Sequence, residues 1–288
     1  MTLFQLLTEG VQTLQEVGNS EAEQDARQLL LAAFHLDMVH FLLNRLQELE
    51  ENEDNTAYTA SYREMLAKRK QRIPLQQILG CQDFMGMTFY VNEHVLIPRQ
   101  DTETLVELVL EEQRDSSKRV LDLCTGSGCI AVSLAAKGAY AQVTATDISE
   151  EALRVARRNA ERHGCAIRFV QGDLLEALSG EAVQYDIITS NPPYIPTSVI
   201  RTLEPEVREH EPMLALDGTE DGLYFYRRIA AGAGHCLKPG GTIYLEIGYD
   251  QGIAVSGFLK EAGFEQVQVH KDLPGKDRVI RGTWPGKR

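Results

Sequence analysis

The sequence predicts an α/β fold, in which a small helical bundle precedes a doubly wound, mostly parallel sheet with a terminal antiparallel strand. Three features support it. Apolar, β-branched runs over residues 119–123, 142–146 and 185–190 are typical of buried strands. A glycine turn follows the first run and leads into a small apolar helix. The chain before residue 74 shows helical spacing instead.

Residues 1–73 are expected to form the helical bundle. Helices are predicted over residues 3–17, 40–49 and 59–70. Ser20 and Glu23 form a capping box for another helix between the first two. The acidic run 48–54 is expected to be a solvated helix end and loop. Without a catalytic motif, the bundle is either a docking domain for a protein substrate or a structural cap.

Pro74 begins a predicted hairpin linker over residues 74–98, because residues 77–95 alternate like paired strands. The catalytic domain then covers residues 99–288. Its further predicted elements are a helix over 102–113, strands over 166–171 and 242–247, a helix over 251–262, and an antiparallel pair over 267–271 and 278–282. The insertion 196–222 is either a loop over the substrate entrance or a polar surface loop.

The turn after the first strand is a candidate ligand site. Gly126 and Gly128 permit positive φ and let backbone N–H groups approach a ligand at a helix N-terminus. With Ala131, they match a dinucleotide-binding pattern, and Asp147 follows Gly126 by 21 residues. The Asp147 carboxylate is expected to accept both ribose hydroxyls. A nicotinamide cofactor and S-adenosylmethionine (SAM) both fit these features.

Other residues favour SAM over a nicotinamide dehydrogenase. Asp122 lies within the first strand, where a carboxylate attracts a cationic ligand such as a sulfonium. Asp173 and Leu174 follow a strand, where an acid accepts from an adenine amino group and a leucine packs on its face. No Tyr-x-x-x-Lys hydride-relay pair lies near the strand over residues 185–190.

The tetrapeptide Asn191-Pro192-Pro193-Tyr194 follows the strand 185–190, at the sheet edge where open α/β folds bind ligands. The Asn191 side-chain oxygen and the Pro192 carbonyl can each accept an N–H of a planar NH2 group, which draws the nitrogen lone pair toward a methyl donor. Proline restricts the backbone here, and Tyr194 can stack on a flat substrate. The motif predicts methylation of an amide or aminopurine nitrogen, mostly by positioning.

The chain resembles the protein-(glutamine-N5) methyltransferases that modify peptide chain release factors, over nearly its whole length. The resemblance includes the tetrapeptide, which adenine-N6 DNA methyltransferases share, and a more specific block, Ile97-Pro98-Arg99-x-Asp101-Thr102-Glu103. Further matching blocks are Glu211-Pro212, Asp221-Gly222-Leu223, Glu246-Ile247-Gly248 and Asp277-Arg278.

This resemblance implies a Rossmann-like SAM-dependent domain that methylates the glutamine of the Gly-Gly-Gln motif in class 1 release factors, releasing S-adenosyl-L-homocysteine. The implied SAM contacts are Cys124, Thr125, Gly126, Ser127, Gly128, Asp147, Asp173, Leu174 and Asn191, with Pro98 and Arg99 as a wall. The implied glutamine site is Asn191, Pro192, Pro193 and Tyr194. Cys124 stands where the family usually has glycine, so a side chain enters the SAM loop.

Composition agrees with a protein substrate. The formal net charge of −13 repels phosphate backbones and counts against a nucleic-acid substrate. Five cysteines without disulfide or zinc spacing indicate a reducing compartment and no metal. No segment has the apolar length of a membrane span. We expect a cytoplasmic protein. The alternatives are an adenine-N6 nucleic-acid methyltransferase and a non-catalytic SAM-binding scaffold.

Overall fold

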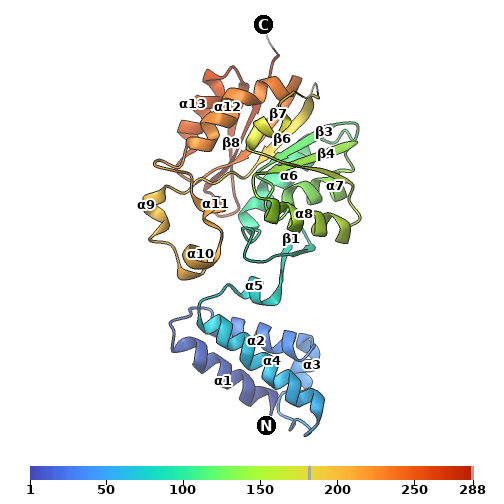
Figure 1. Ribbon diagram of the computed structural model, residues 1–288, viewed down its shortest axis with the longest axis vertical. Coiled ribbons are helices and arrows are strands. Elements are labelled where there is room, and N and C mark those ends of the chain that lie inside the picture. Colours follow the sequence, from blue (N-terminus) through green and yellow to red (C-terminus); the bar gives the residue numbers. More distant parts are fainter. Residues whose placement is uncertain (181–182, 287–288) are drawn as a thin grey trace. The chain divides into compact units, whose positions relative to one another are not determined.

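The computed structural model describes residues 1–180 and 183–286 (Figure 1). The chain forms two compact units. The bundle unit contains Met1–Gly80 and Pro205–His210, and the sheet unit contains Cys81–Glu204 and Glu211–Arg288. The division into residues 1–73, 74–98 and 99–288 stays a prediction.

The bundle unit is helical throughout its regular structure. Its helices are α1 (Leu3–Gln15), α2 (Ala22–Ala33), α3 (Met38–Asn44), α4 (Glu53–Lys70), α5 (Leu75–Leu79) and α10 (Pro205–His210). Leu6 and Leu14 of α1 are fully buried against Leu29 of α2 and Tyr62 of α4 in one apolar core. The bundle therefore has its own hydrophobic core, as the helical spacing predicts.

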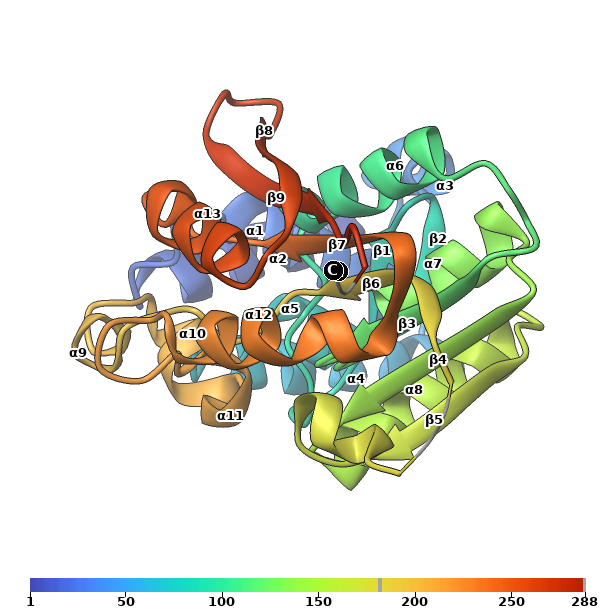
Figure 2. The same ribbon diagram turned by 90° about the horizontal axis from the view of Figure 1, so that it is seen from above.

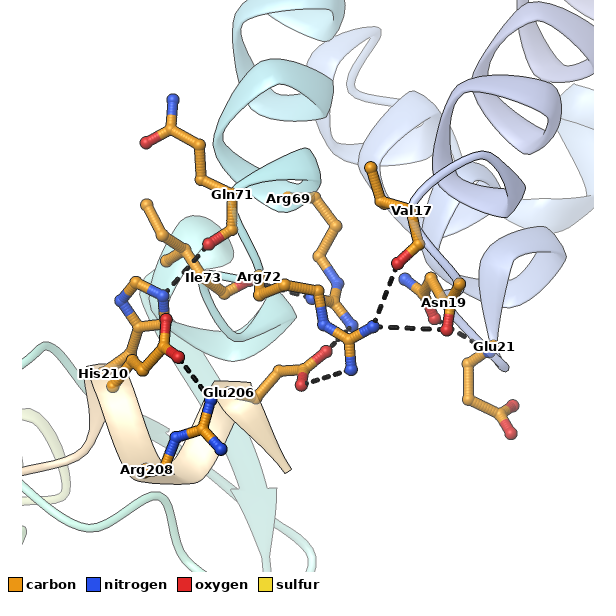
Figure 3. Close-up of polar contacts among 12 residues, drawn as sticks. Val17, Asn19, Glu21, Arg69, Gln71, Arg72, Ile73, Glu206, Arg208 and His210 are labelled. Atoms are coloured by element: carbon orange, nitrogen blue, oxygen red, sulfur yellow. Dashed lines mark hydrogen bonds and ion pairs between the residues drawn. The ribbon is translucent and has the colours of Figure 1, made fainter. Parts of the chain in front are cut away.

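Helix α10 joins this bundle through a buried ion-pair cluster, although it lies far along the chain (Figure 3). The two Glu206 oxygens accept from Arg69 Nη2 at 2.8 Å and Arg72 Nη2 at 2.7 Å. Arg69 Nε also donates to Asp25 at 2.6 Å. Removing one member of such a cluster leaves a buried charge without compensation, which is strongly destabilising. This part of the predicted insertion is thus a helix of the bundle, which the sequence did not predict.

The predicted capping box at Ser20 is wrong. Helix α2 begins after Glu21, and no side chain caps its first turn. Asn19 holds this corner instead, because its Oδ1 accepts from the Glu21 N–H at 2.8 Å and its Nδ2 donates to Asp25 at 2.8 Å. A buried asparagine therefore replaces the predicted serine cap.

The predicted bounds of the next two helices are also wrong. Helix α3 begins at Met38 rather than at residue 40, because the Asp37 side chain caps its first turn by accepting from the His40 N–H at 2.8 Å. The helix ends at Asn44 rather than at residue 49. Helix α4 begins at Glu53, within the acidic run, because the Asn52 side chain caps it. Glu53 and Asp54, the last two acids of the run, lie in the first turn of α4, where the helix dipole favours negative charge.

The sheet unit alternates strands and helices. Its strands are β1 (Cys81–Phe84), β2 (Met87–Tyr90), β3 (Arg119–Leu123), β4 (Gln142–Asp147), β5 (Ile167–Gln171), β6 (Tyr185–Ser190), β7 (Leu237–Glu246), β8 (Glu265–Lys271) and β9 (Asp277–Thr283). Its helices are α6 (Glu103–Glu112), α7 (Cys129–Gly138), α8 (Glu150–Arg162), α9 (Thr197–Ile200), α11 (Met213–Leu216), α12 (Tyr224–Cys236) and α13 (Gly252–Glu261), with 3-10 turns η1 (Gln100–Thr102) and η2 (Leu174–Leu178).

The large sheet has the strand order β5-β4-β3-β6-β7-β9-β8. Strands β3 to β7 pair in parallel, and β9 runs antiparallel to both β7 and β8. Helices α6, α7 and α8 pack on one face and α12 and α13 on the other (Figure 2). This confirms the predicted doubly wound fold with a terminal antiparallel strand. Parallel pairing puts the carboxyl ends of β3, β4 and β6 at one edge.

The predicted hairpin is β1 paired antiparallel with β2, and the start of its predicted span is helix α5 instead. Asn159 of α8 connects the hairpin to the glycine turn. Its side chain accepts from the Tyr90 N–H at 2.7 Å and donates to the carbonyls of Tyr90 at 3.0 Å and Ser127 at 2.9 Å. One buried amide thus fixes both segments beside the carboxyl ends of the strands.

Three structural findings bear on partners and metals. No single helix among the described residues is long and apolar enough to cross a membrane, although α2 and α3 pass a length and composition test as a pair bent by 93°. The five cysteines are free thiols. Within the described ranges, no three His, Cys, Asp or Glu side chains gather in a way that suits a metal ion.

Replacing Gly128 by alanine is expected to destabilise the sheet unit by about 2 kcal/mol or more. Gly128 has a φ of +79°, and an added Cβ would meet the Ala156 Cβ at 3.0 Å, so strain and a clash with α8 combine. Gly164→Ala is the control, because Gly164 has a φ of +65° but open space around it, and should cost about 1 kcal/mol. Urea unfolding measures both; equal losses would contradict the predicted contact.

Candidate active site

A cavity of about 300 Å³ lies at the carboxyl ends of β3, β4 and β6, and this volume is in the range of small-molecule sites. It brings together most of the site residues predicted from the sequence. Those that line it are Pro98, Arg99, Cys124, Thr125, Gly126, Ser127, Asp147, Asp173, Leu174, Asn191 and Pro193.

Three predicted residues do not line the cavity: Gly128, Pro192 and Tyr194. Gly128 lies against α8, where it allows close packing. Pro192 is buried. The Tyr194 ring packs against the core, and its hydroxyl donates to Glu246 Oε1 at 3.4 Å. The stacking of Tyr194 on a flat substrate stays a prediction.

Asp122 is a buried carboxylate that forms a hydrogen bond with the glycine turn. Its carboxylate accepts from the Thr125 hydroxyl at 2.6 Å and from the Thr189 hydroxyl at 2.8 Å. Asp122 is fully buried and does not line the cavity, whereas its partner Thr125 does. Burial raises the pKa of Asp122 to about 7, although the two hydroxyl donors act in the opposite direction.

Asp147 lies at the end of β4, where its position is fixed by backbone donors. Its Oδ2 accepts from the Gly126 N–H at 2.9 Å, and its Oδ1 accepts from the Ser149 N–H at 2.9 Å. Burial raises the pKa of Asp147, and these backbone hydrogen bonds partly offset the effect. Each carboxylate oxygen still has a second lone pair, so the side chain can accept two hydroxyls of a ligand.

Two cavity residues have a left-handed backbone without being glycine. Cys124 has a φ of +56° and Leu174 a φ of +49°. Such conformations cost about 1–3 kcal/mol each and are typical of functional sites. The left-handed φ gives a physical reason why glycine suits position 124. Burial raises the pKa of the Cys124 thiol well above its usual range, so this cysteine is not a reactive thiolate.

Helix α12 supplies cavity residues that the sequence analysis missed, namely Tyr224, Phe225 and Arg228. Arg228 binds Asp173 at 2.8 Å and Glu176 at 2.7 Å. The Asp173 carboxylate is therefore oriented by an arginine of α12. The sequence carries no signal for this pair, because 55 residues separate its members.

The cavity wall at Arg99 depends on Glu211, for which the sequence analysis proposed no role. Arg99 Nη2 donates to Glu211 Oε2 at 2.6 Å, and the Ile97 N–H donates to Oε1 at 3.2 Å. Burial raises the pKa of Glu211, and the Arg99 charge partly offsets this. The following residues Pro212, Leu214 and Ala215 complete this wall. In the sequence, the matching block Glu211-Pro212 was the indication that these residues have a role at the site.

Curated relatives match almost the whole chain. The release factor glutamine methyltransferase of Geobacter sulfurreducens is 44% identical over 93% of this chain and 92% of its own length. The protein of the same name from Moorella thermoacetica is 44% identical over 97% of this chain and 98% of its own length. The chain belongs to the release factor glutamine methyltransferase family.

Two family models agree with membership in the release factor glutamine methyltransferase family, and a solved structure agrees with the fold. The models are the methyltransferase small domain, over residues 100–203, and the PrmC N-terminal domain, over residues 5–80. A methyltransferase from Pyrococcus furiosus aligns with a TM-score of 0.52 at 20% identity, covering 71% of this chain and 91% of its own. This last likeness shows the fold alone. The resemblance stated from the motifs is confirmed.

Asp122→Asn is expected to flatten the dependence of stability on pH. Because the folded-state pKa of about 7 lies above that of an unfolded aspartate, the folded state binds an extra proton, and this stabilisation is lost as pH rises through 7. One such group makes the protein about 1.4 kcal/mol more stable at pH 6 than at pH 8. Urea unfolding at both pH values should show the variant losing this difference; an unchanged difference would contradict it.

Proposed function

We propose that this chain transfers a methyl group from SAM to the side-chain amide nitrogen of the glutamine in the Gly-Gly-Gln motif of class 1 release factors, releasing S-adenosyl-L-homocysteine. The main support is the position of Asn191 at the same cavity as Asp147 and the glycine turn, in a chain of this family. The names of the relatives supply the release factor as substrate.

The cavity residues suit SAM. The two oxygens of Asp147 are positioned to accept the ribose hydroxyls, and Gly126 lets the backbone come close because no side chain intervenes. Ile148 and Leu174 offer apolar surfaces to the flat adenine. When bound, SAM supplies an electrophilic methyl group.

Asn191 and Pro192 are proposed to hold the substrate amide. An amide nitrogen is a weak nucleophile because its lone pair is delocalised. The Asn191 side-chain oxygen accepts one N–H and the Pro192 carbonyl accepts the other, so partial positive charge on the nitrogen is stabilised as its new bond to carbon forms. The bond between sulfur and the methyl carbon breaks as the nitrogen–carbon bond forms, and the nitrogen then releases one proton to solvent water to give the neutral N-methyl amide. Positioning supplies most of the acceleration, and no strong base is needed.

We further propose that the protein works in the cytoplasm and has no direct nucleic-acid substrate. Adenine-N6 enzymes share the tetrapeptide, but a net charge of −13 opposes a polyphosphate substrate. A scaffold that only binds SAM would not need the two acceptors for a substrate amide, the Asn191 side-chain oxygen and the Pro192 carbonyl.

Asn191→Ala and Asp147→Ala are expected to separate chemistry from SAM binding. Without the Asn191 oxygen, methyl transfer should fall by about 100-fold or more, while SAM binding is retained. Without the Asp147 carboxylate, SAM should bind at least about tenfold more weakly. Mass spectrometry of an unmethylated release factor measures transfer, and calorimetry measures SAM affinity. Normal turnover in Asn191→Ala would refute the proposed amide site.

We also propose that the bundle unit docks the release factor, through an exposed apolar face of α3. Met38, Val39, Leu42 and Leu43 lie at helical spacing and point to solvent, with Leu46 just beyond the helix, while Phe41 is buried. Contiguous apolar surface of this kind is typical of protein interaction sites. A release factor is a large protein substrate, so contacts far from its glutamine can contribute to its affinity.

The double substitution Val39→Ser and Leu43→Ser is expected to raise the KM for an intact release factor about tenfold, because two apolar contacts that the docked release factor would bury are lost. The KM for a short Gly-Gly-Gln peptide should not change. Ile253→Ser is the matched control, since Ile253 is 92% exposed but lies on α13. Steady-state kinetics with the release factor and with the peptide measures both KM values. An unchanged KM for the release factor would contradict docking by α3.

A further inference from the structure

The middle of the tetrapeptide has no backbone donor, because Pro192 and Pro193 lack an N–H group. The direction of the Pro192 carbonyl, a proposed acceptor for the substrate amide, therefore depends on how the chain is held on either side. On the preceding side, Ser190 ends β6, and its hydroxyl donates to the Leu123 carbonyl at 2.9 Å. On the following side, the corresponding anchor is at Tyr194.

The side chain of Gln251 holds the backbone at Tyr194. Gln251 precedes α13 and is 8% exposed. Its Nε2 donates to the Tyr194 carbonyl at 3.0 Å and to the Gly222 carbonyl at 3.2 Å. Its Oε1 accepts from the Gly248 N–H at 2.9 Å. All three partners are backbone groups with fixed roles as donor or acceptor, so only this orientation of the amide satisfies them.

Two glycines let a second segment of the chain approach the same carbonyl. Gly222 has a φ of +73°, and an added Cβ there would lie 2.3 Å from the Tyr194 carbonyl oxygen. An added Cβ at Gly218 would lie 2.8 Å from the Tyr194 carbonyl carbon. The Ile195 N–H donates to the Leu216 carbonyl at 3.1 Å, and the Gly218 N–H donates to the Ile195 carbonyl at 2.8 Å. Residues 216–222 thus pack closely against the end of the tetrapeptide.

We propose that Gln251 is a positioning residue for methyl transfer, which holds the Tyr194 carbonyl and thereby keeps the Pro192 carbonyl directed at the substrate amide. This rests on the proposed function of the tetrapeptide. Proline fixes φ at two successive residues, so a displacement at Tyr194 is passed along the chain instead of being absorbed. Among the described residues, Gln251 does not line the cavity. Its loss therefore affects the rate of methyl transfer rather than SAM binding.

Gln251→Met tests the hydrogen bonds, because methionine is also unbranched and of similar length but cannot replace the three contacts. The kcat for a release factor should fall about tenfold or more, the scale expected when an acceptor is misplaced near the reacting atoms. The KM for the release factor and the SAM affinity should stay near their native values. Mass spectrometry of the release factor measures kcat and KM, and calorimetry measures SAM affinity.

Gln113→Met is the matched control. Gln113 is also 8% exposed, and its Nε2 donates to the Tyr244 hydroxyl at 2.7 Å at the end of α6. The same substitution there removes a buried glutamine amide that has no contact with the tetrapeptide. Thermal melts should show a loss of stability in both variants, whereas kcat should fall only in Gln251→Met.

Gly222→Ala displaces the same carbonyl by a different route, so the test does not depend on the folding of one variant. The added Cβ would push against the Tyr194 oxygen, and kcat should again fall about tenfold or more. Gly164→Ala is its control, because Gly164 has a similar φ of +65° with open space around it, and kcat should remain native.

The outcomes separate the role of Gln251 from the proposed function. Native kcat in Gln251→Met or in Gly222→Ala would overturn the positioning role, and so would a loss of kcat that is equally large in the matched controls. With Asn191→Ala inactive, those results leave the amide site in place. Full turnover in Asn191→Ala would instead remove the proposed site and the role of Gln251 with it. Loss of kcat in both variants, with native kcat in both controls, would support the proposal.

Discussion

The hydrogen bonds to Asp122 hold the ligand-binding edge of the sheet together. Its two carboxylate oxygens join the Thr125 hydroxyl of the glycine turn to the Thr189 hydroxyl of β6, at 2.6 and 2.8 Å. The turn that suits SAM and the strand that leads to Asn191 are thereby fixed to one buried group. In the proposed function, the ligand at the turn and the substrate amide at the tetrapeptide would meet in a geometry set by the core, as catalysis by positioning requires.

The sheet could be predicted because its signal is local. The β-branched runs mark β3 and β6 with the bounds that the structure has, and the alternation of strands and helices dictates parallel pairing. The helix bounds of the bundle were harder to predict, because helix ends depend on single side chains. Asn52 begins α4 inside a stretch whose charges suggested a loop, and Asn19 replaces the expected serine cap. In both cases an asparagine side chain outweighed the composition around it.

Site residues that belong to one motif or strand end could be predicted from the sequence. Residues that reach the site from distant segments could not. Asn191, Asp147 and the glycine turn each follow a strand, so topology alone brings them together. Arg228 and Glu211 orient cavity residues from elsewhere in the chain, and no spacing rule connects them to their partners. The left-handed backbone at Cys124 was also hidden, because sequence rules reserve that conformation mainly for glycine.

Two glutamates, one half-buried and one fully buried, show how environment sets the ionisation of a carboxylate in this fold. Burial raises the pKa of Glu206, but hydrogen bonds from Arg72 and Arg69 outweigh it and hold that pKa below its usual range. Burial raises the pKa of Glu246 to about 7, and the Arg278 charge offsets this rise only in part. Each oxygen of Glu206 accepts from an arginine, which fixes α10 to the bundle. In Glu246, Oε2 has no hydrogen-bond partner among the described residues, so desolvation outweighs the groups that stabilise the charged form, and the protonated carboxyl group is favoured more than it is in Glu206.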